Sequence, residues 1–301
     1  VPPAVLFDHY AFRTGSTPSL RAHLRGLAET WGGKGRFVVE VGSNDGALLR
    51  EFKVTGATVL GYEPAANIAA IANAEGLKTL VRYFGPVVHE GPLADVVVAR
   101  NVMAHCPDLA GFIRAVRETM KPTGALIVEA PWVTSIFESP DGFAQTYHEH
   151  GYTLGVASMR NLFAAHSMKV VDARFVDLHG GSLQYEVSYA TNRQESDVLA
   201  RLEAREWEAG CYAEAGRLQF REKAERARTT LRWLLEKWKA AGKVYGGYCA
   251  SAKGSVMLQY LDRNHAFQGI ADRNPIKHGR RMAGTWLPIV AEEDMRSQKP
   301  D

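Results

Sequence analysis

A glycine-rich turn, EVGSNDG at residues 40–46, overlaps the end of the apolar run RFVVEV at residues 36–41. Small residues here let the backbone approach a ligand, and the start of the following helix offers unpaired N–H groups. Glu63 ends a second apolar run, 21 residues after Gly42, where a carboxylate accepts hydrogen bonds from both hydroxyls of a ribose. The pattern predicts a nucleoside site. The alternative is a structural turn that binds nothing.

The acidic residues of this turn distinguish between two nucleoside cofactors. Glu40 and Asp45 would attract the ammonium and sulfonium charges of S-adenosylmethionine (SAM) but repel the pyrophosphate of NAD. The turn also lacks the G-x-G-x-x-G spacing that suits a pyrophosphate. We therefore expect SAM as the cofactor, with Gly46 at the start of the helix beside it. An NAD(P)-dependent oxidoreductase is the alternative.

Four residues that could carry proton chemistry stand together in QTYHEHGY: Tyr147, His148, Glu149 and His150. A neutral histidine is the usual general base near pH 7. If the segment is extended, His148 and His150 share one side of it. His-x-His is also typical of a metal pair, but the chain has no spaced cysteines to complete such a site, so no metal is expected. A surface loop with two solvated histidines is the alternative.

Two more histidines lie near the ends of predicted strands. His105 occurs in NVMAHCPD, and His179 precedes Gly180 and Gly181 in LHGGSLQYE. The glycine pair would bring backbone close to a ligand, and His105 could line the same cleft. A structural histidine and a simple tight turn are the alternatives.

A third glycine loop, YGGYCASAKGS at residues 245–255, lies in a basic region. Ser251 and Lys253 would open a helix there and hold a phosphate, and Lys277 and Arg280 follow in DRNPIKHGRRMAGT. These features predict a substrate that carries a diphosphate, with a solvated basic surface as the alternative. Residues 191–301 carry 20 basic and 15 acidic side chains, an excess that suits a small anion better than a nucleic acid.

These groups would be positioned by an α/β fold. Apolar runs that alternate with helical stretches predict a parallel sheet, covered on both faces, in a Rossmann-like domain. The expected strands are residues 36–41, 58–64, 78–84, 94–102 and 124–131. A helix over 157–168 then precedes two antiparallel strands at the sheet edge, KVVDARFVDLHG and SLQYEVSYA.

Four segments are expected along the chain. They are an N-terminal segment (1–34), the cofactor domain (35–192), a helical connector (193–242) and a smaller C-terminal α/β domain (243–301). The connector reads as one or two long helices with a break at Gly210 or Gly216. In the last domain, KVYGGYCA, SVMLQYLD and GIADRNP predict a strand, a helix and a further strand with its turn.

Composition excludes several classes of protein. The chain has 301 residues, 46% hydrophobic and 23% charged, which is ordinary for a globular protein of about two domains. We expect no membrane span and no signal peptide, because the apolar runs are short and the N-terminus lacks the charged-then-apolar order. Three widely spaced cysteines argue against a disulfide framework and indicate a cytoplasmic protein.

Taken together, the motifs resemble the sugar C-methyltransferases, SAM-dependent enzymes that methylate nucleotide-linked keto-deoxysugars in deoxysugar and antibiotic biosynthesis. The resemblance runs from about residue 8 to the end. The matching pieces are EVGSNDGALL, GYEPAANIA, NVMAHCPD, YHEHGYT, HGGSLQYE, YGGYCASAKGS and DRNPIKHGRRMAGTWLPI.

The resemblance also implies roles for residues. It places Gly42, Asn44, Glu63, Pro64 and Asn101 near SAM and Phe84 against the adenine. It implies His150 as the general base, with Tyr147 and Glu149 beside it and His105 on the substrate side. The remaining substrate contacts are expected from the histidine and basic segments: His148, His179, Gly180, Gly181, Ser251, Lys253, Lys277 and Arg280.

Two features of the family are missing from the chain. Members usually begin with a small zinc-binding domain of C-x-x-C pairs, and they usually continue past the K-P-D found here at residues 299–301. We expect either a short member or part of a longer protein. Rival functions are methylation of oxygen, nitrogen or a non-sugar carbon, and a non-enzymatic partner subunit. The acceptor, the carbon that is methylated, the stereochemistry and the oligomeric state stay open.

Overall fold

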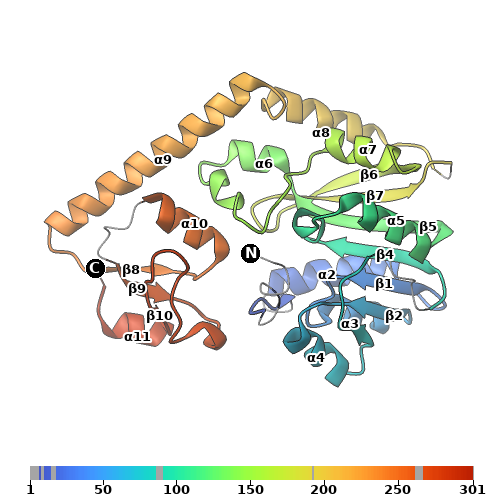
Figure 1. Ribbon diagram of the computed structural model, residues 1–301, viewed down its shortest axis with the longest axis horizontal. Coiled ribbons are helices and arrows are strands. Elements are labelled where there is room, and N and C mark those ends of the chain that lie inside the picture. The colour runs from blue at the N-terminus through green and yellow to red at the C-terminus, as the bar shows by residue number, and fades with distance from the viewer. Residues whose placement is uncertain are drawn as a thin grey trace. The chain divides into compact units, whose positions relative to one another are not determined.

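The computed structural model describes residues 7, 10–14, 18–85, 91–191, 193–261 and 267–300. It divides into two compact units (Figure 1). The first contains residues 1–135 and 149–208, and the second contains residues 136–148 and 209–301. The expected boundaries do not coincide with this division: residues 193–208 of the expected connector group with the first unit, and residues 136–148 of the expected cofactor domain group with the second.

The described residues of the first unit form a seven-stranded sheet in the order β3-β2-β1-β4-β5-β7-β6. Strands β1 to β5 run parallel, and β7 joins β5 and β6 in antiparallel fashion. The strand bounds are β1 Phe37–Val41, β2 Thr58–Tyr62, β3 Thr79–Leu80, β4 Ala94–Arg100, β5 Met120–Pro131, β6 Met168–Val176 and β7 Ser182–Tyr189. The expected parallel sheet with an antiparallel edge pair is therefore confirmed.

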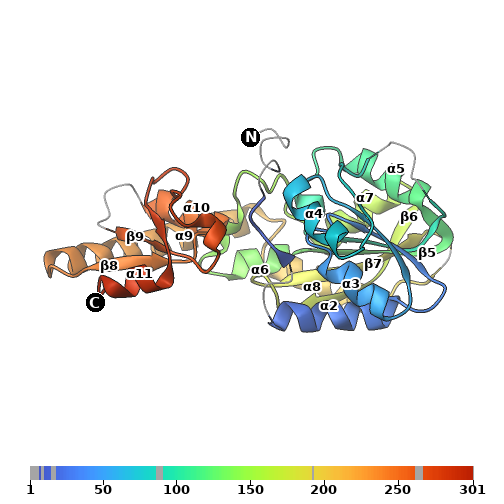
Figure 2. The ribbon, with the colours of Figure 1, turned by 90° about the horizontal axis from the view of Figure 1, so that it is seen from below.

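Helices cover both faces of this sheet, with α2 and α3 on one face and α5 and α7 on the other (Figure 2). The helices of this unit are α2 Pro18–Trp31, α3 Ala47–Val54, α4 Ala66–Ala74, α5 Leu109–Thr119, α7 Val156–Ala164 and α8 Asp197–Glu208, with the short helix η2 Met103–His105. Helix α6, Val133–Glu138, includes the boundary between the units, and η3, Gly142–Gln145, belongs to the second unit. Leu24, Leu27 and Phe52 of α2 and α3 pack against Val98 and Ile127 of β4 and β5. This apolar layer fixes the strand ends that carry the site.

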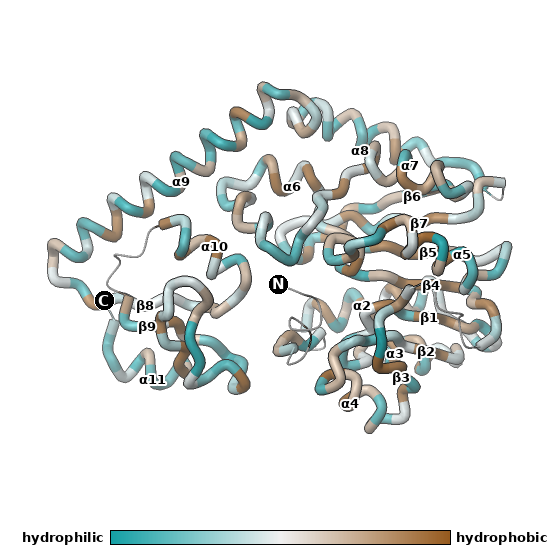
Figure 3. The backbone as a smooth tube through the Cα atoms, viewed as in Figure 1, coloured by the Kyte–Doolittle hydropathy of each residue, from teal (hydrophilic) through white to brown (hydrophobic). Residues whose placement is uncertain are grey.

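The second unit contains a parallel three-stranded sheet in the order β10-β9-β8. Its elements are α9 Glu214–Ala240, β8 Tyr245–Tyr248, α10 Ala252–Leu261, β9 Phe267–Ala271, η4 Pro275–Lys277, β10 Ile289–Val290 and α11 Glu292–Ser297. Apolar positions recur along the mainly hydrophilic helix α9 (Figure 3). Leu235 of α9 contributes to a core with Tyr245 and Leu261.

The expected helix break is confirmed, whereas the expected third strand is too long. The helix break at Gly210 is confirmed, since this residue has a φ of 76° between α8 and α9, whereas Gly216 lies inside α9. The expected third strand over 78–84 is wrong in extent: only Thr79–Leu80 pairs with β2. The chain leaves the sheet after Leu80, and Tyr83 and Phe84 line a cavity instead. Within the described residues, no helix has the length and apolar character needed to cross a bilayer.

Candidate functional site

A cavity of about 470 Å3 opens at the carboxyl ends of β1, β2 and β4 in the first unit. Ligands of open parallel sheets bind at this edge. The lining includes most of the predicted cofactor ligands: Glu40, Gly42, Asn44, Glu63, Pro64, Phe84 and Asn101. Asp45 and Gly46 are not among the lining residues. Gly46 serves the packing of α3 instead, since a Cβ there would lie 2.9 Å from the Cβ of Ala72.

The first glycine turn brings backbone to the cavity wall. Gly42 has a φ of 66°, and a Cβ on it would lie 2.8 Å from a methyl group of Val102. Asn44 also adopts a left-handed conformation, with a φ of 49°, which asparagine tolerates better than most residues. Its N–H donates to the Glu63 carboxylate at 2.9 Å, so the turn and the end of β2 are tied together.

Glu63 is buried at the cavity and held in one orientation. Its second carboxylate oxygen accepts a hydrogen bond from the N–H of Ala65 at 2.8 Å. Burial raises the pKa of Glu63, and the two N–H donors oppose that rise. A carboxylate oxygen can accept more than one hydrogen bond, so Glu63 can still accept hydrogen bonds from ribose hydroxyls.

A buried charge network adjoins the cavity, and it was not predicted. Arg100 lines the cavity and donates from Nε to Oε2 of Glu129 at 2.6 Å. Gln184 donates to the other oxygen of Glu129 at 2.6 Å, and the ring of His23 contacts that same oxygen closely. The three strand residues are register partners, Arg100 with Glu129 and Glu129 with Gln184.

These contacts set the charge states of two buried acids. Burial disfavours the charged form of Glu129, but Arg100 and His23 outweigh it and lower the pKa to about 2. Glu40, also buried, has its pKa raised well above the usual value by burial, with Arg100 opposing the rise. Oε2 of Glu40 has no hydrogen-bond partner among the described residues. A cationic ligand group would satisfy this oxygen.

Aromatic rings also line the cavity. Phe84 packs edge-on against Tyr62 and Phe112, with ring centroids 5.1 and 5.8 Å apart. Phe12 and Tyr83 also line the cavity, although 47% and 51% of their surfaces are exposed. Rings that face a cavity in this way offer apolar surface to a flat, apolar group such as a purine.

The predicted catalytic histidines lie together beside the cavity. His105, in η2, lines it, and the ring centroid of His150 is 4.9 Å from that of His105. The N–H of Gly151 donates to the carbonyl of Ala104 at 2.8 Å, which holds the two segments side by side. Oε2 of Glu149 lies 3.8 Å from Nδ1 of His105. Burial lowers the pKa of His105, and an interaction with the backbone of Glu149 opposes that change.

The Tyr147–His150 segment is not extended, because His148 and Glu149 form a turn, so the condition for His148 and His150 to share one side is not met. The division into compact units also falls within this segment. Tyr147 and His148 group with the second unit, whereas Glu149 and His150 group with the first. Alternation along a strand therefore does not decide which of these side chains act together.

The hairpin between β6 and β7 brings another predicted residue to the cavity. His179 lines it, and His179, Gly180 and Gly181 all have left-handed backbones, with φ of 57°, 88° and 97°. A Cβ on Gly181 would collide with the hydroxyl of Ser135. The carbonyl of Gly181 accepts a hydrogen bond from the N–H of Trp132 at 3.1 Å, so this tip is fixed to the end of β5.

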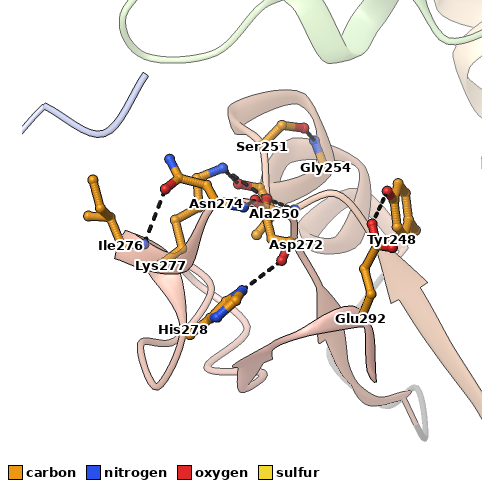
Figure 4. A network of polar contacts seen from close by, with 10 residues as sticks. All are labelled: Tyr248, Ala250, Ser251, Gly254, Asp272, Asn274, Ile276, Lys277, His278 and Glu292. Atoms are coloured by element: carbon orange, nitrogen blue, oxygen red, sulfur yellow. Dashed lines mark hydrogen bonds and ion pairs between the residues drawn. The ribbon is translucent and has the colours of Figure 1, made fainter. Parts of the chain in front are cut away.

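In the second unit, the loop before α10 is held by a network of polar contacts (Figure 4). Lys277 donates from Nζ to the carbonyl of Ala250 at 2.7 Å and to Oδ2 of Asp272 at 2.9 Å. Asp272 also accepts from the N–H of Ala250, and Ser251 accepts from the N–H of Gly254 at 3.1 Å. Lys277 therefore contacts protein groups that shape the loop.

The other two basic residues predicted for the substrate differ in their surroundings. Burial lowers the pKa of Lys253, and Asp141, in the same unit, opposes that change. Arg280 is exposed. No group of three or more His, Cys, Asp or Glu side chains suited to a metal ion occurs among the residues that the structure describes.

Comparisons with known proteins give two family matches. Residues 9–173 match the family described as "Methyltransferase domain", and residues 177–301 match the one described as "C-methyltransferase C-terminal domain". The chain is 31% identical over 313 aligned positions to "C-methyltransferase NovU" of Streptomyces niveus, and the match covers 100% of this chain and 74% of NovU.

Other relatives match a smaller part of the chain. "Ubiquinone biosynthesis O-methyltransferase" of Rhodopseudomonas palustris (strain BisA53) is 32% identical over 96 residues, which cover 30% of this chain and 38% of that protein. Among solved structures, the magnesium protoporphyrin IX methyltransferase (ChlM) of Synechocystis PCC 6803 with bound SAH has a TM-score of 0.46 and 13% identity. That match covers 56% of this chain and 83% of ChlM.

Proposed function

The chain belongs to the SAM-dependent C-methyltransferase family, and on this premise we propose that it methylates a carbon next to a ketone, on a nucleotide-diphosphate keto-deoxysugar. His150 is the general base of this reaction. The observation that carries the proposal is the ring contact between His150 and His105, because His105 also lines the cavity in which we place the cofactor. Proton removal and methyl transfer at one carbon require the base and the cofactor to be neighbours.

The residues of the cavity suit SAM. The partnerless oxygen of Glu40 fits the ammonium group, whose charge would also offset the burial that raises the pKa of Glu40. Glu63 fits the ribose hydroxyls, and the Phe84 ring fits the adenine. SAM supplies the methyl group as an electrophile on a positively charged sulfur.

The protein's own part in the reaction is to move one proton and to hold the resulting charge. A proton next to a ketone can be removed because the enolate spreads the negative charge onto oxygen. The unprotonated ring nitrogen of His150 accepts this proton. The carboxylate of Glu149 lies beside His105, and His105 or Tyr147 donates a hydrogen bond to the enolate oxygen. The lowered pKa of His105 keeps its ring neutral near pH 7.

Recognition of the acceptor rests on two groups of residues. Backbone and imidazole groups of the His148 turn and of the hairpin at 179–181 are the proposed contacts of the sugar. Basic and hydroxyl groups of the second unit are the proposed contacts of the diphosphate: Ser251, Lys253 and Arg280. Lys277 supports that loop through Ala250 and Asp272.

The extent of the matches favours carbon over oxygen as the methylated atom. The match to the C-methyltransferase NovU covers this whole chain, whereas the match to the ubiquinone biosynthesis O-methyltransferase covers only 30% of it. The family that residues 177–301 match is likewise described as a C-methyltransferase domain.

Hydrogen exchange in deuterated water tests the proposal. Nucleotide-linked keto-deoxysugars are incubated with the enzyme and S-adenosylhomocysteine (SAH), and deuterium uptake at the carbon beside the ketone is followed by NMR. We expect His150-dependent uptake, and with SAM a new carbon–methyl bond at that carbon. Methylation of an oxygen or nitrogen acceptor, with every keto sugar unchanged, would contradict the proposal.

A further inference from the structure

The N-terminal segment Tyr10–Thr14, here called the strap, is fastened by two asparagine side chains. The amide of Asn67 donates to the carbonyl of Tyr10 at 2.9 Å and accepts from its N–H at 3.3 Å. The amide of Asn44 donates to the carbonyl of Phe12 at 3.1 Å and accepts from the N–H of Thr14 at 2.9 Å. Each amide thus makes a pair of hydrogen bonds to strap backbone.

The strap forms part of the wall of the proposed cofactor cavity. Tyr10, Phe12 and Thr14 all line it. Asn44 connects the strap to the nucleoside site, because its own N–H donates to Glu63. Closing the strap over a bound nucleoside would cover the half-exposed ring of Phe12 and remove apolar surface from water.

We propose that Asn67, which is not among the cavity-lining residues, is a positioning residue that holds the strap over bound SAM and slows its release. The inference rests on the proposed placement of the cofactor. Asn67 lies in α4, four residues after Glu63, so one short segment carries both the proposed ribose carboxylate and the strap fastening. Loss of Asn67 would remove two hydrogen bonds from the backbone of Tyr10 and leave Glu63 in place.

The same helix supplies a matched control. The amide of Asn73 donates to the carbonyl of Thr79 at 2.9 Å and accepts from its N–H at 3.0 Å. The chemistry matches that of Asn67, but Asn73 fastens β3 instead of the strap. Asn67→Ala and Asn73→Ala therefore each remove two side chain–backbone hydrogen bonds from α4, and only the first acts on the cavity.

The test measures how fast radiolabelled SAH leaves each protein after dilution into unlabelled ligand. We expect release from Asn67→Ala to be roughly 5- to 30-fold faster than from wild type, as two modest hydrogen bonds predict. Asn73→Ala should remain within about twofold of wild type. Equal release rates for the two variants, whether fast or slow, would overturn the proposal.

The rate of proteolysis at saturating SAH gives a second test, which does not depend on the affinity for SAH. Trypsin cuts after arginine, and the side chain of Arg13, the fourth of the five strap residues, is half exposed. Saturating SAH should slow that cleavage in wild type and Asn73→Ala but not in Asn67→Ala. Unaltered protection in Asn67→Ala would refute a role for Asn67.

Glu63→Ala separates this proposal from the placement of the cofactor. If Glu63→Ala loses SAH while Asn67→Ala behaves as wild type, the strap proposal fails and the cavity stands. If Glu63→Ala binds SAH as tightly as wild type, the placement of the cofactor itself is wrong.

Discussion

The imidazole rings of His105 and His150 lie 4.9 Å apart, centroid to centroid, with their planes at 73°. The two residues are 45 positions apart in the sequence. The hydrogen bond from Gly151 to Ala104 joins the residues next to them, so the backbone itself fixes the pair. His105 lines the cavity, and its ring contact places His150, the proposed proton acceptor, beside that cavity.

Replacing His150 by alanine should lower the turnover number by about 10²–10⁴, as loss of a general base does. SAH affinity should stay near wild type, because His150 is not among the cavity-lining residues. Single-turnover assays with a keto-sugar acceptor and calorimetry with SAH measure the two effects. His166→Ala, which alters a histidine outside the site, is the control. Equal turnover by His150→Ala and wild type would remove His150 from its role.

Glu129 should make the fold sensitive to acid. Its pKa in the fold, about 2, lies below the usual 4.5, so the stability that it contributes is complete above pH 4.5. That contribution should be lost progressively between pH 4.5 and 2, and it amounts to roughly 3 kcal/mol. Urea unfolding across this range should show a shallower pH slope for Glu129→Gln than for wild type.

A surface variant serves as the comparison for this slope. Glu75 forms an exposed ion pair with Arg50, and such pairs contribute little to stability. Glu75→Gln should therefore leave the slope unchanged. If Glu129→Gln also keeps the wild-type slope, the acid sensitivity of the fold comes from other carboxylates.

Glu206 should be a strong determinant of stability, because this fully buried carboxylate of α8 binds both the residue after β5 and the first turn of α7. Its Oε1 accepts from the indole N–H of Trp132 and from the N–H of Val156, both at 2.7 Å. Glu206→Ala would leave two buried donors unpaired and should reduce the free energy of unfolding by roughly 2–5 kcal/mol. Glu208→Ala, an exposed change in the same helix, should stay within about 0.5 kcal/mol of wild type.

Lys253 and Lys277 should separate into a binding and a structural role. Lys253→Ala should raise the KM of the nucleotide-linked acceptor about tenfold or more with little change in kcat, as loss of uniform binding does. Lys277→Met removes the donor to Ala250 and Asp272, and should lower stability to urea by roughly 1–3 kcal/mol. A raised KM with full stability in Lys277→Met would show that Lys277 binds the acceptor directly.

Local signals in the sequence were sufficient to predict most of the sheet and most of the residues that line the cavity at the ends of its strands. The apolar runs of β1, β2, β4 and β5 are buried strands, and Gly42 has the left-handed backbone expected of a glycine turn. The length of the strand–helix–strand unit sets the sequence separation between Gly42 and Glu63, and Glu63 accordingly follows the carboxyl end of β2.

The rest of the site depends on contacts between distant segments. Arg100, Glu129 and Gln184 meet because their strands pair in one particular register, which no local pattern specifies. The strap was expected only as part of an N-terminal segment, since it lacks periodicity and its hydrogen bonds go to Asn44 and Asn67. The expected third strand was too long because the apolar rings of Tyr83 and Phe84 line the cavity and do not belong to the sheet.

The strap has a consequence for the speed of the catalytic cycle. Each round of methylation leaves a spent cofactor molecule behind, and it must depart before a fresh one enters. On the proposed placement of the cofactor, the four hydrogen bonds that Asn44 and Asn67 make to the strap would slow the release of the spent cofactor as well as that of SAM. Tight retention and rapid throughput therefore oppose each other in this protein. When fresh cofactor is plentiful, a loosened strap should relieve product inhibition.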